Sequence, residues 1–395
     1  MSEPSGNTRP VLIAGGGIGG LAVALALAAK GRRSRVLEQS AKFGEIGAGI
    51  QLGPNVFRMF DRMGLSDAVR AVTFFPENLI MRDATSGEEV TRIPVGSEAF
   101  RQRYRFPYGV IYRADLHQVL LDACRRSPLI DLATSHKVTG YRSAGSGVVA
   151  SLEGRDGVEG AALIGADGLW SKVRAQMLGD GAPRVSGHIA YRAVLPIDEV
   201  PPQWRSESVV LWGGAKHHLV HYPLRHGDIF NLVAVFHSNR YEEGWDTYGD
   251  PAELEAFFRG SHPQVMGLLA KINAWKMWVL CDREPVKTWS DGRVTLLGDA
   301  AHPMLQYLAQ GACMAVEDAV VLADKVEAAG DDYASAFAAY QEARYLRTGR
   351  VQLTARFYGE FYHAGGVTAE VRNALFGKRT PQQALEGMAW LYDGI

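Results

Sequence analysis

Residues Val11–Gly20 read VLIAGGGIGG, an apolar run followed directly by a segment in which five of six residues are glycine. The apolar run predicts a buried strand, and the uncharged segment Leu21–Ala29 continues with the pattern of a helix. Ser34–Glu38 predicts a second strand. A strand, a helix and a second strand in this order form a right-handed unit of a parallel sheet. The sequence therefore predicts an α/β domain at this end of the chain.

The glycines of this turn have the spacing Gly15-x-Gly17-x-x-Gly20, which is typical of a dinucleotide-binding loop. Gly15 allows a tight turn, Gly17 lets the backbone approach a pyrophosphate, and Gly20 lets the helix and strand pack closely. The pyrophosphate would meet free amide groups at the positive end of the helix dipole. Glu38 follows Gly20 by 18 residues, where its carboxylate can accept a hydrogen bond from a ribose hydroxyl. The alternative is a plain glycine-rich turn beside a solvated Glu38.

Composition and charge exclude several classes of protein. The 395 residues include 42 Lys and Arg and 43 Asp and Glu, so the net charge is −1 and offers no field to hold nucleic acid. Three widely spaced cysteines form neither a disulfide framework nor a metal motif, and favour a reducing, cytoplasmic location. Val11–Ala29 carries no charge, but its glycines favour buried core over a membrane span or signal peptide. We expect a soluble protein.

The length predicts more than one folding unit. We expect a discontinuous nucleotide-binding domain over 1–182 and 286–395, interrupted by a β-rich domain over 183–285. The expected helices lie at 54–69, 115–126 and 333–362, and the expected strands at 80–95 (with a turn at 86–87), 209–212, 217–223, 229–237 and 294–297.

Two further motifs follow the glycine loop along the chain. Gly165–Arg174 reads GADGLWSKVR after a short apolar run, and Gly298–Pro303 reads GDAAHP after an expected strand. With the glycine loop and Arg113–Leu116 (RADL), these motifs resemble those of the single-component flavin aromatic hydroxylases, the group A flavoprotein monooxygenases. The resemblance covers most of the chain. It implies a Rossmann-like FAD-binding domain, an inserted β-rich substrate domain and a helical C-terminal tail, as in the p-hydroxybenzoate hydroxylase-like fold.

The same resemblance implies that the chain binds FAD tightly but not covalently. Asp299 would hydrogen-bond the ribityl chain, Asp167 would lie near the pyrophosphate, and Arg113 would lie close to the flavin. Gly311 and Ala312 would open a helix aimed at the flavin, where a helix N-terminus stabilises negative charge. NADH or NADPH would visit transiently, since there is no second dinucleotide motif. The implied cofactor-binding residues are Gly15, Gly17, Gly20, Glu38, Arg113, Asp167, Asp299, Pro303, Gly311 and Ala312.

A histidine-rich stretch, His217–Pro223, reads HHLVHYP. In a strand, His218 and Tyr222 would share one face, whereas His217 and His221 would share the other. His218 and Tyr222 would lie about 13 Å apart along the strand, so their long side chains could converge on a ring between them. Three histidines could instead bind a metal, but neighbours on opposite faces disfavour that interpretation. An inert histidine-rich strand is the remaining alternative.

This stretch and Gly298–Gly311 are similar to those of family members that hydroxylate 3-hydroxybenzoate. The resemblance implies that His218 and Tyr222 hold and activate the phenol oxygen, while Tyr108 and Gln306 position the ring. The implied reaction converts 3-hydroxybenzoate, NADH and O2 to gentisate and water. It uses a flavin C4a-hydroperoxide, which attacks the ring para to the phenol oxygen.

The carboxylate of such a substrate has no evident partner in the sequence. Arg192 and Arg225 are candidates by nearness to the histidine-rich stretch, and uncharged donors could also serve. Decarboxylating hydroxylation of salicylate and 3-hydroxylation of 6-hydroxynicotinate would use the same flavin motifs. More distant alternatives are an NAD(P)H oxidase or reductase that releases peroxide, and a flavoprotein that only binds or senses.

The segment Tyr333–Tyr362 is rich in aromatic residues. Aromatic side chains at this density predict packing against the flavin domain, and a homodimer interface or a lipid-contacting surface are the alternatives.

Overall fold

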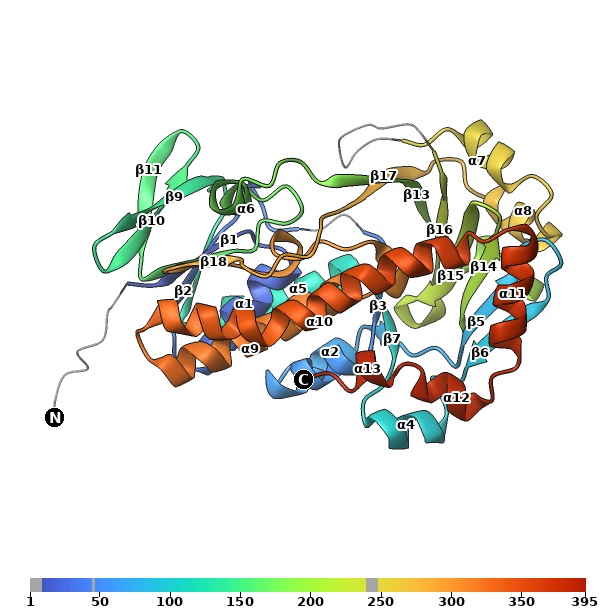
Figure 1. The fold of residues 1–395 in the computed structure, drawn as a ribbon, viewed down its shortest axis with the longest axis horizontal. Coiled ribbons are helices and arrows are strands. Elements are labelled where there is room, and N and C mark those ends of the chain that lie inside the picture. Colours follow the sequence, from blue (N-terminus) through green and yellow to red (C-terminus); the bar gives the residue numbers. More distant parts are fainter. Residues whose placement is uncertain (1–8, 45–46, 239–247) are drawn as a thin grey trace.

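The architecture is that of a computed structural model, which describes residues 9–44, 47–238 and 248–395. A parallel sheet containing β1 (Val11–Ala14) lies toward one end of the molecule, and a sheet containing β15 (His217–Leu224) toward the other (Figure 1). The long helix α10 (Tyr333–Tyr362) runs from the first region to the second. It therefore connects the two parts of the fold that the sequence places far apart.

The first sheet is the predicted dinucleotide-binding core. β1 pairs in parallel with β2 (Ser34–Leu37) and with β12 (Ala162–Gly165). α1 (Ile18–Ala29) packs against it, and most of its side chains are buried. The uncharged stretch at 11–29 is thus a strand, a turn and a short helix. Along the part of the chain that the structure describes, no helix is long and apolar enough to span a membrane.

The full order of this sheet is β18-β19-β12-β1-β2-β8. The strands not yet given are β8 (Ile130–Ala133), β18 (Ser290–Asp291) and β19 (Val294–Leu296). All of these pairings are parallel except β18 with β19. The sheet therefore has the mostly parallel form expected of a nucleotide-binding fold.

The second large sheet has seven strands in the order β17-β13-β16-β15-β14-β5-β6. Two of its strands, β5 (Leu79–Asp83) and β6 (Glu89–Ile93), come from outside the 183–285 segment. β5 joins by parallel pairing with β14 (Val209–Gly214). The remaining strands are β13 (Arg184–Pro196), β16 (Ile229–His237) and β17 (Lys276–Asp282). The predicted division of the chain into domains remains a prediction, to which this sheet adds residues 79–93.

Two small sheets complete the strands. They consist of β3 (Gly49–Leu52), β7 (Gly109–Tyr112) and β4 (Thr73–Phe74), and of β9 (Val138–Ala144), β10 (Gly147–Leu152) and β11 (Arg155–Gly160). The helices not yet given are α2 (Pro54–Arg62), α3 (Ser66–Arg70), α4 (Glu98–Tyr104), α5 (Arg113–Arg126), α6 (Lys172–Leu178), α7 (Pro251–Phe258), α8 (Pro263–Leu269), α9 (Gly311–Ala329), α11 (Gly366–Gly377), α12 (Pro381–Glu386) and α13 (Ala389–Tyr392). The helix expected over 54–69 is interrupted, because Gly64 takes a left-handed conformation with φ of 68° between α2 and α3.

Candidate active site

A cavity of about 500 Å³ lies where the first sheet meets the seven-stranded sheet. On one side it is lined by the turns that follow β1, β12 and β19, which are the carboxyl ends of parallel strands. On the other side it is lined by β5, β14, β15 and β16. The predicted site residues that line it are Gly17, Tyr108, Arg113, His218, Tyr222, Asp299, Gln306, Gly311 and Ala312. Five others, Gly15, Gly20, Glu38, Asp167 and Pro303, are not among its lining residues.

The glycine loop needs its glycines for close backbone contacts. Gly15 has φ of 102°, and a Cβ placed there would overlap the carbonyl oxygen of Ala166. A Cβ on Gly20 would overlap the carbonyl oxygen of Gly15. The Glu38 carboxylate accepts hydrogen bonds from the amides of Gly16 and Ser40, both at 2.8 Å. Glu38 therefore lies against the loop, where the sequence placed it, and is not a solvated side chain.

Asp167 secures the second motif. Its carboxylate accepts hydrogen bonds from the hydroxyl of Ser171 at 2.6 Å and from the amide of Lys172 at 2.8 Å. Burial raises the pKa of Asp167 although these hydrogen bonds oppose the shift. Its neighbours Ala166 and Gly168, rather than the carboxylate, line the cavity. The Asp167 side chain thus stabilises the turn that places the backbone of Ala166 and Gly168 at the cavity wall.

The third motif is held from two sides. The buried guanidinium of Arg174 donates hydrogen bonds to the carbonyl oxygens of Ala300 and Ala301, at 3.0 and 2.6 Å. From the other side, Asp318 on α9 accepts a hydrogen bond from the amide of Gly298 at 3.1 Å. Between these anchors the Asp299 carboxylate opens to the cavity, and desolvation by the surrounding protein raises its pKa. The orientation of Asp299 is therefore fixed by the hydrogen bonds that hold the backbone on either side of it.

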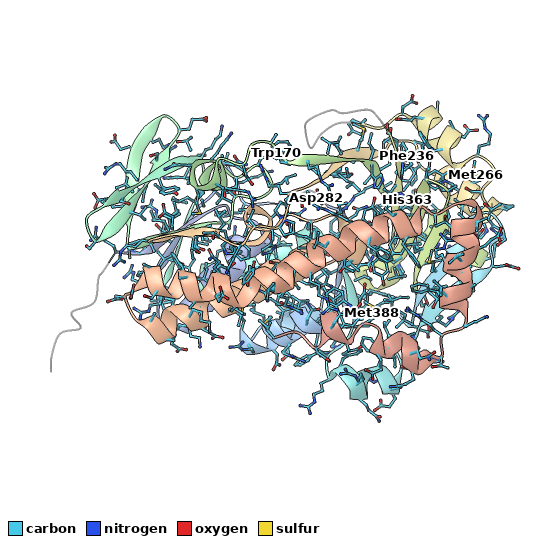
Figure 2. The ribbon with its side chains drawn as sticks, in the orientation of Figure 1. Trp170, Phe236, Met266, Asp282, His363 and Met388 are labelled. Atoms are coloured by element: carbon cyan, nitrogen blue, oxygen red, sulfur yellow. The ribbon has the colours of Figure 1, made fainter. Side chains whose placement is uncertain are left out.

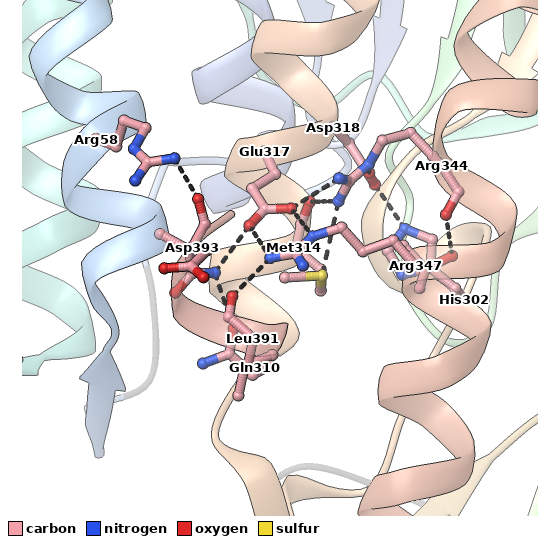
Figure 3. A network of polar contacts seen from close by, with 12 residues as sticks. Arg58, His302, Gln310, Met314, Glu317, Asp318, Arg344, Arg347, Leu391 and Asp393 are labelled. Carbon is pink, nitrogen blue, oxygen red and sulfur yellow. Dashed lines mark hydrogen bonds and ion pairs between the residues drawn. The ribbon is translucent and has the colours of Figure 1, made fainter. Parts of the chain in front are cut away.

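Asp318 belongs to a buried network of ions, which Figure 3 shows between α9 and α10. His302 Nε2 lies 2.6 Å from Asp318, and Arg344 lies 2.6 Å from Asp318 and 2.7 Å from Glu317. Arg347 pairs with Glu317 at 2.7 Å. Although burial opposes the shift, the contact with His302 and the guanidinium of Arg344 lower the pKa of Asp318, and the two arginines lower the pKa of Glu317. The network fixes the beginning of α9, so that Gly311 and Ala312 face the cavity.

The histidine-rich stretch forms the other wall. His218, Val220 and Tyr222 on β15 all line the cavity, as the alternation of a strand requires. His218 Nδ1 lies 2.7 Å from Nε2 of His363, a residue that the sequence analysis did not identify. Burial lowers the pKa of His218 to about 3 and raises the pKa of Tyr222. Both groups are therefore uncharged.

The other two histidines of the stretch do not join His218. His217 Nδ1 lies 3.0 Å from the carbonyl oxygen of Ala215, and His221 accepts a hydrogen bond from Trp212 at 3.0 Å. The three do not converge on one point that a metal could occupy.

Gln51 on β3 joins the two tyrosines of the site. The hydroxyl of Tyr108 donates a hydrogen bond to its side-chain oxygen, and Tyr222 also hydrogen-bonds Gln51. Nothing in the short strand around Gln51 marks it as a site residue. Only the pairing of β3 with β7 brings it beside Tyr108.

The two candidate arginines have different fates. Arg225 forms a bidentate pair with Asp115, at 2.9 and 2.8 Å, and is not among the cavity-lining residues. Arg192 on β13 lines the cavity and donates a hydrogen bond to Gln306. In the described ranges no carboxylate pairs with Arg192, and desolvation lowers its pKa. A partly buried cation therefore faces the same space as His218.

The aromatic tail divides into three groups of side chains. Tyr358, Phe361 and Tyr362 line the cavity, whereas Phe337 and Tyr340 are buried in the core. Phe357 is 61% exposed. The end of α10 thus contributes directly to the site.

The residues around the cavity fit a flavin dinucleotide. The space extends from the glycine loop, past the open Asp299 carboxylate, to the N-terminus of α9. A Cβ at Gly311 would have only Asp299 Oδ1, at 3.8 Å, within 4 Å, so the backbone there is accessible. Free amides at helix N-termini suit a pyrophosphate and an electron-rich ring, and a carboxylate suits sugar hydroxyls.

Comparisons with known proteins agree with this arrangement. Residues 8–352 match the model of a family described as "FAD binding domain". The chain is 46% identical over 385 residues to 3-hydroxybenzoate 6-hydroxylase of Polaromonas naphthalenivorans (strain CJ2), covering 97% of this chain and 95% of the relative. It is 44% identical to 3-hydroxybenzoate 6-hydroxylase 1 of Aquipseudomonas alcaligenes, covering 97% of each. The crystal structure of Klebsiella pneumoniae HpxO complexed with FAD and uric acid superposes with a TM-score of 0.86 at 27% identity, covering 98% of this chain and 97% of that one. The chain belongs to this family of FAD-binding proteins.

Proposed function

We propose that this chain is an FAD-dependent monooxygenase that hydroxylates 3-hydroxybenzoate para to its hydroxyl group, with NADH and O2, to give gentisate. The observation that carries the proposal is the meeting of His218, Tyr222 and Arg192 on one cavity that also opens to Asp299 and the start of α9. A phenolic acid needs a proton acceptor at one substituent and a cation at the other. Relatives named for this reaction share 44–46% of their residues with the chain, which supports the same choice.

The first requirement is removal of the phenol proton. A phenol has a pKa near 10, so its phenolate costs about 4 kcal/mol at pH 7 unless the site stabilises it. His218 accepts the proton at Nε2, because its Nδ1 is engaged by His363. Tyr222, whose pKa is raised by burial, keeps its proton and donates a hydrogen bond to the phenol oxygen. The two residues together favour the electron-rich form of the ring.

The second requirement is a partner for the carboxylate. Arg192 is partly buried, faces the cavity and has no carboxylate partner among the residues that the structure describes. A charge-assisted hydrogen bond to the substrate would satisfy it. Gln306, which accepts a hydrogen bond from Arg192, holds the guanidinium in place.

The cofactor would lie along the opposite wall. The glycine loop, Asp167 and Pro303 shape the backbone around it, and Asp299, Arg113 and the start of α9 would contact it. When bound, FAD supplies the redox chemistry, which consists of the oxidation of NADH or NADPH and the activation of O2. The protein's own part is to enclose the ring, exclude water and set the protonation of the phenol.

The decisive experiment is product identification. The FAD-loaded protein is incubated with NADH, O2 and 3-hydroxybenzoate, and the aromatic products and peroxide are quantified. Gentisate in a yield close to the NADH consumed is expected. Peroxide without gentisate would instead support an oxidase. Turnover of salicylate or 6-hydroxynicotinate alone would move the proposal to one of those reactions.

The role of Arg192 has a matched control in the chain. We expect Arg192→Gln to raise KM for 3-hydroxybenzoate about 10- to 100-fold, since hydrogen bonds to charged groups contribute about 1.5–3 kcal/mol. The variant should also lose the preference of the wild-type protein for 3-hydroxybenzoate over the uncharged 3-hydroxybenzamide. Arg225→Gln, at an arginine already paired with Asp115, should change neither value. Equal KM values for the two variants would remove Arg192 from the site.

We infer that the protein acts as a homodimer in the cytoplasm. The support for a second copy is a set of exposed apolar side chains on α10 and α11. They are Leu346, Leu353, Phe357, Val367, Val371 and Leu375. A single-mass species of two chains by light scattering, lost in Leu353→Glu, would support the dimer, and a wild-type monomer would exclude it. Among the residues that the structure describes, the three cysteines form no disulfide with one another, which fits a reducing compartment.

A further inference from the structure

Behind His218 lies a cluster of histidines that the proposed reaction has not yet used. His188 on β13 pairs across the sheet with His237 on β16, and His218 stands on the neighbouring strand β15. The fourth member, His363, caps the C-terminal end of α10, where Figure 2 labels it. Three of the four are buried, and His237 is half-buried.

Three of these histidines form a continuous chain of hydrogen bonds. His218 Nδ1 lies 2.7 Å from His363 Nε2, and His363 Nδ1 lies 3.1 Å from His237 Nε2. A neutral imidazole has one nitrogen that donates and one that accepts. All three rings can therefore point the same way, each donating to the next, from the cavity to the half-buried His237. His188 lies beside this chain, since its Nδ1 is engaged by the hydroxyl of Tyr307.

We propose that His218, His363 and His237 form a proton relay that carries the phenol proton from the cavity to solvent. The proposal rests on the proposed function, in which His218 Nε2 takes that proton. As it arrives, the proton on His218 Nδ1 passes to His363 Nε2, and the proton on His363 Nδ1 passes to His237 Nε2. His237 then releases a proton from Nδ1 to water. One proton enters and one leaves, no electrons move, and the reverse sequence returns a proton when the product is neutralised.

The surroundings of the chain explain why a proton would not stay on His218. Burial and the neighbouring His188 and His217 lower the pKa of His218, and burial and the other histidines lower the pKa of His363. At His237, burial and Lys216 also lower the pKa, but the carboxylate of Glu360 opposes them.

Tyr307 and Tyr362 are two further titratable groups beside His218. Burial raises the pKa of both, so they stay neutral and add no charge to the chain. The most favourable place for the proton is therefore the end of the chain that is nearest to solvent.

A metal ion is the competing use of this cluster. The ligand atoms of His188, His237 and His363 lie within 4.8 Å of one another. Both ring nitrogens of His363 are already engaged, however, and Tyr307 engages His188. A cation would have to break the chain that the structure shows, which makes metal binding an outcome of the test.

The relay is tested by proton release from the FAD-loaded protein. Binding of 3-hydroxybenzoate is followed in weak buffer by stopped flow, with an indicator dye for the proton and ultraviolet absorbance for the bound phenolate. We expect His237→Gln and His363→Ala to release the proton at least tenfold more slowly than wild type. Imidazole should restore at least half of the rate in His363→Ala, because it fits the space left by the ring. A purely structural role would not produce this rescue.

His217→Gln is the matched control. His217 is a buried histidine on the same strand and lies near the chain, but its ring nitrogens hydrogen-bond Ala215 and Ser261 rather than the three histidines of the relay. It should release the proton at the wild-type rate. Rates within twofold of wild type in both relay variants would overturn the proposal. So would a folded, FAD-containing His363→Ala that does not respond to imidazole, and His237→Gln decides alone if His363→Ala does not fold.

Two further outcomes distinguish the relay from a metal site and from a failure of the proposed function. Stoichiometric zinc bound after dialysis against zinc chloride, and lost in His188→Gln, would replace the relay with a metal site. If wild type makes no gentisate, the proposed function fails, but proton release can still be read with salicylate or 6-hydroxynicotinate. A release slowed in His237→Gln with either ligand would keep the relay.

Discussion

Two buried polar regions flank the cavity, and they are built on opposite principles. Beneath the start of α9, Glu317 and Asp318 are fully buried and charged, and each is matched by an arginine of α10. Behind the substrate wall, His218 and His363 are just as deeply placed but carry no opposite charge, and burial keeps them neutral. The first region pairs its charges, and the second avoids them.

The difference teaches what each region can do. A buried ion pair is expensive to disturb, because removing one partner leaves an uncompensated charge. Such a network suits the task of holding Asp299 and the N-terminus of α9 in one geometry. Neutral histidines in hydrogen-bonded contact can exchange donor and acceptor roles without leaving a charge behind. They suit a task in which a proton moves.

The largest effect is expected from breaking the neutral region at its cavity end. His218→Gln removes the proposed proton acceptor, and we expect hydroxylation of 3-hydroxybenzoate to fall about 10²- to 10⁴-fold, the usual contribution of a general base. FAD content, measured from the flavin absorbance of the purified protein, should stay at the wild-type value because the cofactor wall is untouched. Gentisate formation within threefold of wild type would show that His218 is not the base.

The next effect comes from breaking the charged region. Arg344→Met leaves Glu317 and Asp318 short of a partner, and we expect the free energy of unfolding to fall by about 3–5 kcal/mol. Urea unfolding of the FAD-loaded protein measures this change. The control is Arg92→Met, whose partner Glu89 lies 2.6 Å away on the surface. This exposed pair should contribute less than about 1 kcal/mol, and equal losses in both variants would contradict the contrast between paired burial and surface pairing.

Sequence patterns predicted those features of the site that depend on residues close together in the chain. The strand, turn and helix around Gly15–Gly20 and the acid at Glu38 follow from spacing alone, and the structure has them. The alternation along β15 likewise places His218 and Tyr222 on one face. In each of these cases the deciding neighbours lie within one or two elements of the chain.

The parts that sequence reasoning missed depend on distant neighbours. His363, which the sequence analysis did not identify, lies 145 residues from His218. Arg192 and Gln306 are both candidates from the sequence, but they lie 114 residues apart, and no local pattern predicts the hydrogen bond between them. Strands β5 and β6 join the seven-stranded sheet only by pairing with β14, which no local pattern encodes. Arg192 and Arg225 look equivalent beside the histidine-rich stretch, and only the pair of Arg225 with Asp115 separates them.

The smallest effect sharpens the contrast through pH. His221 accepts a hydrogen bond from Trp212 and, like His218, is kept neutral because burial lowers its pKa to about 3. In the unfolded chain a histidine has a pKa of about 6.5, so below that pH the unfolded state binds a proton that the folded state does not. The stabilisation from such a histidine is complete above pH 6.5 and decreases as the pH falls toward the folded-state value. Between pH 7 and pH 5 the loss is about 2 kcal/mol for each histidine.

The charged region should be silent over the same range. The pKa of Asp318 and that of Glu317 are lowered by their cationic partners, so the stabilisation from both is present above the unfolded carboxyl values and is lost only at lower pH. We therefore measure the free energy of unfolding in urea at pH 7, 6 and 5 for wild type and for His221→Gln. The decrease from pH 7 to pH 5 should be smaller in His221→Gln than in wild type by about 2 kcal/mol. Taking the difference between the two proteins cancels the carboxyl groups common to both. If the free energy of unfolding decreased equally in wild type and His221→Gln between pH 7 and pH 5, His221 would be protonated in the folded protein. Only a histidine that is neutral in the folded state and protonated in the unfolded state makes folding less favourable as the pH falls through this range.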